Sequence, residues 1–259
     1  MTQPLLASAP SRESDSLPSG FLVLRQDPAT REYVRVGLLE RRNGGYLFRY
    51  SNRVAKDPGF EPLPGFPDRS RLYESSALFT TFANRVMTPR RDSYRHYLAM
   101  LGLEDIEPEP FEVLARTWGQ RATDRIQLLP IPRVDDAGNV QTRFLVHGGA
   151  HVDPEGRALS AVRSGEALQL QAQPQNTEDR LAVLVLAPPT REKRELGYVP
   201  RPLAPFIHRL WGEGAELRVV ADHVNPPDER LVSGQMRLLV RLMAHVGSGF
   251  DVRAALDGA

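Results

Sequence analysis

The chain has 259 residues, of which 41% are hydrophobic and 25% charged, with a formal net charge of +1 at pH 7. This length and hydrophobic content allow two ordinary domains, and the absence of cysteine excludes disulfides, thiolate metal sites and a cysteine nucleophile. No apolar run approaches the roughly 20 residues of a membrane span, so we expect a cytoplasmic protein. The polar residues 1–20, which lack a charged region followed by an apolar stretch, predict a disordered leader.

The next part of the chain predicts a small antiparallel sheet. Apolar and polar residues alternate over residues 21–26, 33–41 and 46–51, which is typical of strands. Asn43–Gly45 predicts a tight turn between the last two strands, because Asn-Gly tolerates positive φ. The proline-rich residues 60–68 predict a loop.

Two helices are expected after this loop. Apolar residues recur at helical spacing on one face of the first helix, for which Ser75 or Ser76 is the expected cap. These apolar residues are Leu78, Phe79, Phe82, Val86 and Met87. Residues 90–101 predict a second helix, which Gly102 closes.

The ordered segments VGLLERRNGGYLFRYS and PLPGFPDRSRLYESSALFTTFANRVM resemble the small N-terminal subdomain of HipA-type kinases. The resemblance implies an α+β unit over residues 21–108. A HipA-type kinase also needs a large catalytic domain with a catalytic Asp, a downstream Asn and a metal-binding Asp. The chain has no Gly-rich phosphate loop and no HRD-like run, so we expect no kinase activity, no other enzyme activity and no cofactor.

An acidic, proline-containing hinge, EDIEPEP, is the expected domain boundary. Residues 109–143 predict a connecting helix and strand followed by a polar turn at Asp135–Asn139. Near the end of this helix, Trp118 is expected to pack against the first unit rather than to contact a ligand.

The second half predicts a strand over FLVHGGAH that ends in a Gly pair, then a second strand, a polar loop with Asn176 and Asp179, a third strand and a helix entered through proline-rich sequence. The order and spacing of these pieces resemble the HIRAN family, whose small OB-like β-barrels usually belong to DNA-processing proteins. Some members hold single-stranded DNA ends. The resemblance implies a β-barrel with peripheral helices over residues 144–227.

The C-terminal residues 228–259 are expected to form an amphipathic helix and a tail. The helix would dock on the barrel or on another subunit. Its apolar positions are Leu231, Met236, Leu239, Val240 and Met243. The predicted fold is therefore a two-domain α+β protein.

The HIRAN resemblance implies a nucleic-acid site, because members that bind DNA ends have a Gly followed by a basic residue and aromatics, and an Asn and an Asp in the polar loop. In this chain the Gly is Gly148, and the implied binding residues are His151, Asn176, Asp179, Tyr198 and Arg201. A carboxylate can accept a hydrogen bond from a 3′ hydroxyl, aromatic rings can stack on bases, and a guanidinium can bind phosphate.

This chain departs from that pattern at three positions. Ala150 replaces the basic residue, His151 is the aromatic that follows, and Glu178 replaces the aromatic before Asp179. A carboxylate in place of a stacking ring loses about 1 to 3 kcal/mol of stacking and repels phosphate.

Each site residue also has a structural interpretation. Asn176 and Asp179 can organise their own turn, and Tyr198 can be a half-buried aromatic at a strand end. His147 and His151 are four residues apart, but the Gly pair between them argues against a helix and hence against a zinc site. Residues 144–227 carry nine Lys/Arg and ten Asp/Glu, so any DNA would be bound in a local pocket rather than by a basic domain.

Two hypotheses from different classes follow, with an enzyme of unrecognised type as a minor third. In the first, a non-catalytic protein of bacterial type binds single-stranded DNA or DNA ends through the barrel, while the HipA-like unit contacts a protein partner, in DNA repair, DNA-end handling or defence. In the second, the HipA-like unit regulates a HipA-type kinase in trans and the barrel is a degenerate scaffold. A basic, aromatic-lined cleft would favour the first, and an exposed apolar patch would favour the second.

Overall fold

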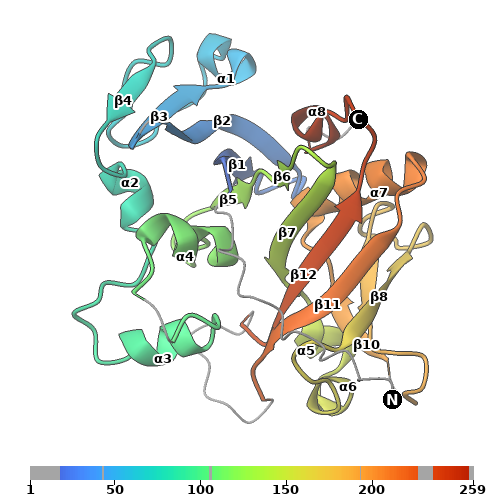
Figure 1. Cartoon of the computed structure of the whole chain (residues 1–259). Helices are drawn as coiled ribbons and strands as arrows, with labels where there is room; N and C mark the ends of the chain where they lie inside the picture. The colour runs from blue at the N-terminus through green and yellow to red at the C-terminus, as the bar shows by residue number, and fades with distance from the viewer. Residues whose placement is uncertain (1–17, 43, 105–106, 193, 227–235, 257–259) are drawn as a thin grey trace, which may run out of the picture.

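The computed structural model describes residues 18–42, 44–104, 107–192, 194–226 and 236–256. These residues form two antiparallel sheets with short helices around them (Figure 1). None of the helices in these ranges is both long and apolar enough to cross a membrane.

The first sheet has five strands in the order β4-β3-β2-β1-β5. The strands are β1 (Gly20–Gln26), β2 (Tyr33–Arg42), β3 (Gly45–Tyr50), β4 (Tyr73–Ser75) and β5 (Ile126–Pro130). Its helices are α1 (Asn52–Lys56), α2 (Thr80–Ala83), α3 (Tyr94–Ala99) and α4 (Pro110–Thr117). The three predicted strands and the loop over residues 60–68 are found. Asn43 of the predicted turn lies outside the described residues, and Gly44 has the expected positive φ of 78°.

The helix that we predicted from Ser75 or Ser76 is wrong in its start and its length. Ser75 ends β4, and α2 has four residues with Phe79 at its N-cap. Beyond α2, the buried guanidinium of Arg85 donates to the carbonyls of Gly119 and Ile126 and pairs with the Asp124 carboxylate at 2.6 Å. These contacts hold the chain at Arg85 against β5 and the residues before it, where the predicted helix does not continue.

The second sheet has seven strands in the order β10-β9-β8-β11-β12-β7-β6. The strands are β6 (Arg133–Val134), β7 (Asn139–Leu145), β8 (Ala167–Ala172), β9 (Val183–Leu186), β10 (Glu195–Tyr198), β11 (Leu217–Val224) and β12 (Leu238–His245). Short helices α5 (Gly149–Val152) and α6 (Arg157–Ser160) follow β7, and η1 (Arg201–Leu203) leads into α7 (Ala204–Gly212).

The predicted OB-like barrel is not closed. Strands β10 and β6 form the two edges of the ladder, and one isolated bridge joins His147, just after β7, to Tyr198 at the end of β10. The backbone N···O distances of this bridge are 2.9 and 2.7 Å.

The predicted C-terminal helix is also wrong. Its apolar residues from Leu239 to Met243 lie on β12, an interior strand between β11 and β7, while Leu231 is outside the described residues. Leu238, Val240 and Leu242 are buried in one core and Leu239 in another, so the strand is apolar on both faces. The chain does form a short helix further on, α8 (Val252–Leu256).

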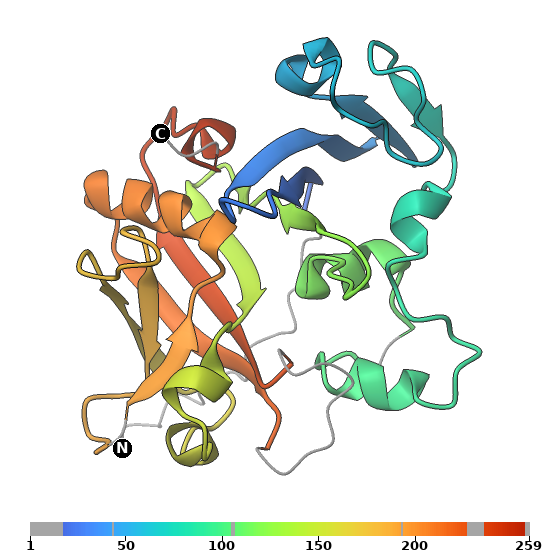
Figure 2. The same cartoon turned by 180° about the vertical axis from the view of Figure 1, so that it is seen from behind.

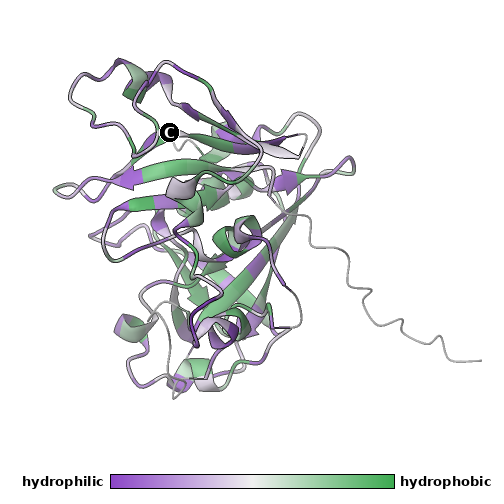
Figure 3. Cartoon of the chain, turned by 90° about the vertical axis from the view of Figure 1, so that its left-hand side faces the viewer, coloured by the Kyte–Doolittle hydropathy of each residue, from purple (hydrophilic) through white to green (hydrophobic). Residues whose placement is uncertain are grey.

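The two sheets share one core. One buried cluster contains residues from both sheets. From the first sheet it includes Leu22 and Leu24 of β1 and Leu38 of β2, and from the second sheet and its helix α7 it includes Phe144, Val240 and Phe206. The alternate residues of β1, Phe21 and Val23, lie in a separate aromatic core. Hydrophobic stretches, drawn in green, lie along strands of both sheets (Figure 3).

The segment that we expected to connect two domains contributes to both sheets. Strand β5 pairs with β1, and β7 starts at Asn139. Trp118, at the end of α4, is 2% exposed in the shared core. Helix α8 lies beside β2 and α7 in both views (Figures 1 and 2), where the Arg253 guanidinium pairs with the buried Glu40 carboxylate of β2 at 2.5 Å.

Candidate functional site

The polar loop between β8 and β9 is a turn that its own side chains organise. The Asn176 Oδ1 atom accepts hydrogen bonds from the backbone N–H groups of Glu178 (3.0 Å) and Asp179 (3.1 Å). The Asp179 Oδ1 atom accepts one from the N–H of Leu181 at 2.9 Å. Both residues therefore fulfil the structural role that we weighed for them, which by itself needs no ligand.

Asp179 also has a contact outside its turn. Its Oδ2 atom lies 3.4 Å from the Nε atom of Arg201, which opens η1 directly after β10. Because Val199 donates its N–H to the carbonyl of Val183, the chain after β10 runs beside the start of β9, next to the Asp179 turn. The sequence thus places an acceptor-only carboxylate next to a five-donor guanidinium.

Arg201 reaches a third segment, the loop over residues 27–32 between β1 and β2. Its Nη1 atom is 3.4 Å from the carbonyl oxygen of Arg31, and the Arg31 guanidinium lies 3.9 Å from the Glu178 carboxylate. Sequence reasoning missed Arg31, because it is 170 residues from Arg201 and belongs to no motif.

The other predicted residues form a second group around the bridge. Gly148 has φ +67°, and a Cβ atom at this position would lie 3.4 Å from the Tyr198 ring. Glycine therefore lets the chain pass close to the half-buried ring. His151 is exposed on α5, and within the described ranges no side-chain hydrogen bond or ion pair joins it or Tyr198 to Asp179 or Arg201.

His147 lies in the bridge itself. Burial lowers the pKa of its imidazole from 6.5 to about 4, since a charged ring would lose its hydration there. The ring is therefore neutral at pH 7. Among the described residues, no group of three or more His, Asp or Glu side chains is arranged to hold a metal ion.

Residues 141–244 match the family model of the HIRAN domain. This part of the chain is a HIRAN domain. The match begins within β7 and ends within β12, so it extends beyond the residues 144–227 over which we expected the barrel and includes the strand that we mistook for a helix. It contains all five predicted site residues. The HipA-like character of residues 21–108 stays a prediction.

Two solved structures are similar to parts of this chain. A crystal structure of a protein from Lactobacillus plantarum is 21% identical and covers 42% of this chain and 100% of that chain, with a TM-score of 0.32. The crystal structure of the HIRAN domain of human HLTF is 15% identical and covers 46% of this chain and 83% of that chain, with a TM-score of 0.30. At these TM-scores, neither likeness carries an argument. No curated protein matches the chain.

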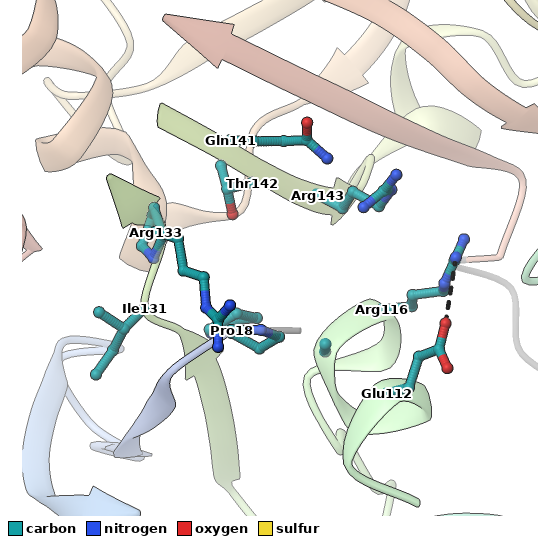
Figure 4. A pocket seen from close by; sticks show the side chains of 11 residues that line it. Pro18, Glu112, Arg116, Ile131, Arg133, Gln141, Thr142 and Arg143 are labelled. Carbon is teal, nitrogen blue, oxygen red and sulfur yellow. Dashed lines mark ion pairs between the residues drawn. The ribbon is translucent and has the colours of Figure 1, made fainter. Parts of the chain in front are cut away.

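A cluster of charges lies between the HIRAN domain and α4, next to a small pocket of about 60 Å³ (Figure 4). The Asp222 carboxylate accepts from Arg143 at 2.7 Å and lies 3.0 Å from Arg241 and 3.9 Å from Arg116. Arg116 also faces Glu112 at 3.8 Å. We interpret this cluster as a structural junction, because its two carboxylates pair with three guanidinium groups and the adjacent space holds about two waters.

Proposed function

We propose that this protein is a cytoplasmic, non-catalytic DNA-binding protein whose HIRAN domain holds a single strand with its 3′ end at the Asp179 turn. HIRAN domains are in general DNA-binding modules, and residues 141–244 match that family. The observation that carries the proposal is the Asp179–Arg201 pair, which is partly open to solvent, with side chains 19% and 38% exposed.

The chemistry of this pair suits a DNA end. The Asp179 carboxylate can accept a hydrogen bond from a terminal 3′ hydroxyl, and a hydrogen bond to a charged group contributes about 1.5 to 3 kcal/mol. Arg201 can turn its planar donors to the phosphate of the last nucleotide. The Tyr198 ring and the exposed His151 ring are the stacking faces that this site offers to bases further along the strand.

The test is fluorescence anisotropy with a labelled single strand that ends in a 3′ hydroxyl, the same strand with a 3′ phosphate, and a duplex. We expect the free hydroxyl strand to bind tightest. Asp179→Asn keeps an oxygen for the N–H of Leu181 but loses the charge, and it should weaken binding of the hydroxyl strand about tenfold.

The matched control is Asp135→Asn. Asp135 is an exposed carboxylate that, like Asp179, organises its own turn, through the N–H groups of Ala137 and Asn139, but it lies in the hairpin before the HIRAN domain. It should leave DNA binding unchanged. If none of the three DNAs binds at low salt, the proposal fails, and the alternative, a regulator that binds a protein partner through its N-terminal unit, takes its place.

A further inference from the structure

The loop over residues 27–32 has a fixed backbone. Asp27 accepts hydrogen bonds at its Oδ1 atom from the N–H groups of Ala29 (2.8 Å) and Thr30 (2.9 Å), which lower the pKa of its carboxyl group. Its backbone bonds both to Glu32 (2.8 Å) and to Arg31 (3.0 Å). Arg31 takes up a left-handed conformation with φ 59°, uncommon for a residue other than glycine.

This loop lies against the Asp179 turn. The carbonyl oxygen of Arg31 accepts from the Gln26 side chain at 3.2 Å and from Arg201 at 3.4 Å. The Arg31 side chain, by contrast, is 74% exposed, and its partner Glu178 is 81% exposed. An exposed ion pair at 3.9 Å is weak, so the guanidinium can leave Glu178 for a stronger anion at little cost.

The turn needs such a cation if it is to hold a nucleic acid. Glu178 and Asp179 place two adjacent carboxylates where a phosphate would approach, and like charges at this range repel each other. Arg201 faces only Asp179 among these acids, at 3.4 Å. Arg31 meets this need, because its backbone is held in place while its side chain is in solvent. Its guanidinium offsets the charge of Glu178 and can bind a phosphate of the strand.

We propose that the β1–β2 loop is part of the DNA site and that Arg31, which lies outside the HIRAN domain, supplies a phosphate contact beside that of Arg201. The proposal rests on the DNA-binding function proposed above. It makes the site a composite of the two sheets, so that the N-terminal unit contributes directly to the affinity for the strand.

The experiment compares Arg31→Ala with wild type, in the full chain, by titrating a labelled single strand with a 3′ hydroxyl at several salt concentrations. Alanine adds no new backbone cost, because arginine already occupies the left-handed conformation. We expect an affinity about three- to tenfold lower at low salt and a salt dependence, log K against log [salt], that is shallower by about 0.7, the value for one phosphate contact to a single strand. Arg31→Lys should keep most of the slope.

The matched control is Arg53→Ala, because Arg53 is also an exposed arginine but lies on α1, after β3. The proposal is overturned if Arg31→Ala behaves like Arg53→Ala while Arg201→Ala weakens binding, although the HIRAN site itself then stands. Tighter binding by Arg31→Ala also overturns it, since the loop would then obstruct the site. If wild type does not bind, both proposals fail.

Discussion

Among single residues, His147 makes stability depend on pH. Its pKa is near 6.5 in the unfolded chain and about 4 in the folded protein, so between these values the unfolded chain binds the proton and the folded protein does not. The free energy of unfolding should therefore fall as the pH drops from about 6.5 toward 4, by at most about 1.4 kcal/mol per pH unit from this residue.

Urea unfolding of His147→Gln at pH 7 and pH 5 checks this expectation. The variant should lose less stability than wild type over this interval, because it lacks the titrating ring. His151→Gln, which changes an exposed histidine four residues away, is the matched substitution. Parallel curves for His147→Gln and wild type would show that burial of this ring does not set the pH dependence.

The predicted site residues divide according to how local their contacts are. Asn176 and Asp179 could be placed in a turn from sequence, because Asn and Asp bond to nearby backbone N–H groups. The HIRAN resemblance implied that Arg201 binds a phosphate, but it did not predict the contact of Arg201 with Asp179. This contact depends on how β9 and β10 pair. Arg31 could not be predicted, since only the packing of the two sheets brings it to Glu178.

At the level of elements, β12 shows why sequence periodicity failed. Leu239, Val240 and Met243 repeat with helical spacing, and leucine, arginine and methionine favour helices. The strand lies inside the sheet and contacts a core on each face, so the alternation that marks a half-buried strand is missing. The predicted strand at 33–41 was correct because the Asn43–Gly45 turn signal follows it. The strand at 21–26 is also found, although β1 likewise contacts a core on each face.

The Asp222 cluster joins β11 to β7, β12 and α4, and we expect it to stabilise this junction. Asp222→Ala removes the carboxylate that faces Arg143, Arg241 and Arg116, whose side chains are 14%, 36% and 9% exposed. Loss of a charged hydrogen bond in a largely buried setting should lower the free energy of unfolding by about 2 to 3 kcal/mol in urea titrations.

A second charge pair provides the control for this measurement. Glu213 pairs with Arg209 at 2.8 Å one helical turn away, with both side chains about half exposed. Glu213→Ala should therefore cost less than about 0.5 kcal/mol. Equal losses for Asp222→Ala and Glu213→Ala would mean that burial adds nothing at the junction.

For the whole molecule, the shared core argues against two independent domains. One face of β1 and β2 supplies Leu22, Leu24 and Leu38 to a cluster that otherwise belongs largely to the HIRAN domain and its flanking helices. Separating the sheets would expose these residues to water, at a cost of about 25 cal/mol for each Å² of apolar surface. We therefore expect the two sheets to unfold together, which also keeps Arg31 beside the Asp179 turn.

The chain's two tryptophans can test this, because they lie next to different sheets although both pack on the shared core. Trp118 accepts at its backbone carbonyl from the N–H of Leu128 on β5, and Trp211 lies on α7 of the HIRAN domain. In Trp211→Phe and in Trp118→Phe, the remaining tryptophan should lose its native fluorescence at the same urea concentration at which circular dichroism changes.

A substitution in the shared core also tests whether the two sheets unfold together. Leu38→Ala removes a side chain that is 2% exposed on β2 and should lower the free energy of unfolding by about 2 to 5 kcal/mol. Because Leu38 lies in the shared core, the substitution should shift the transition reported by Trp211 as far as that reported by Trp118. If only the Trp118 transition moves, the sheets unfold independently, and the β1–β2 loop is not held rigidly at the DNA site.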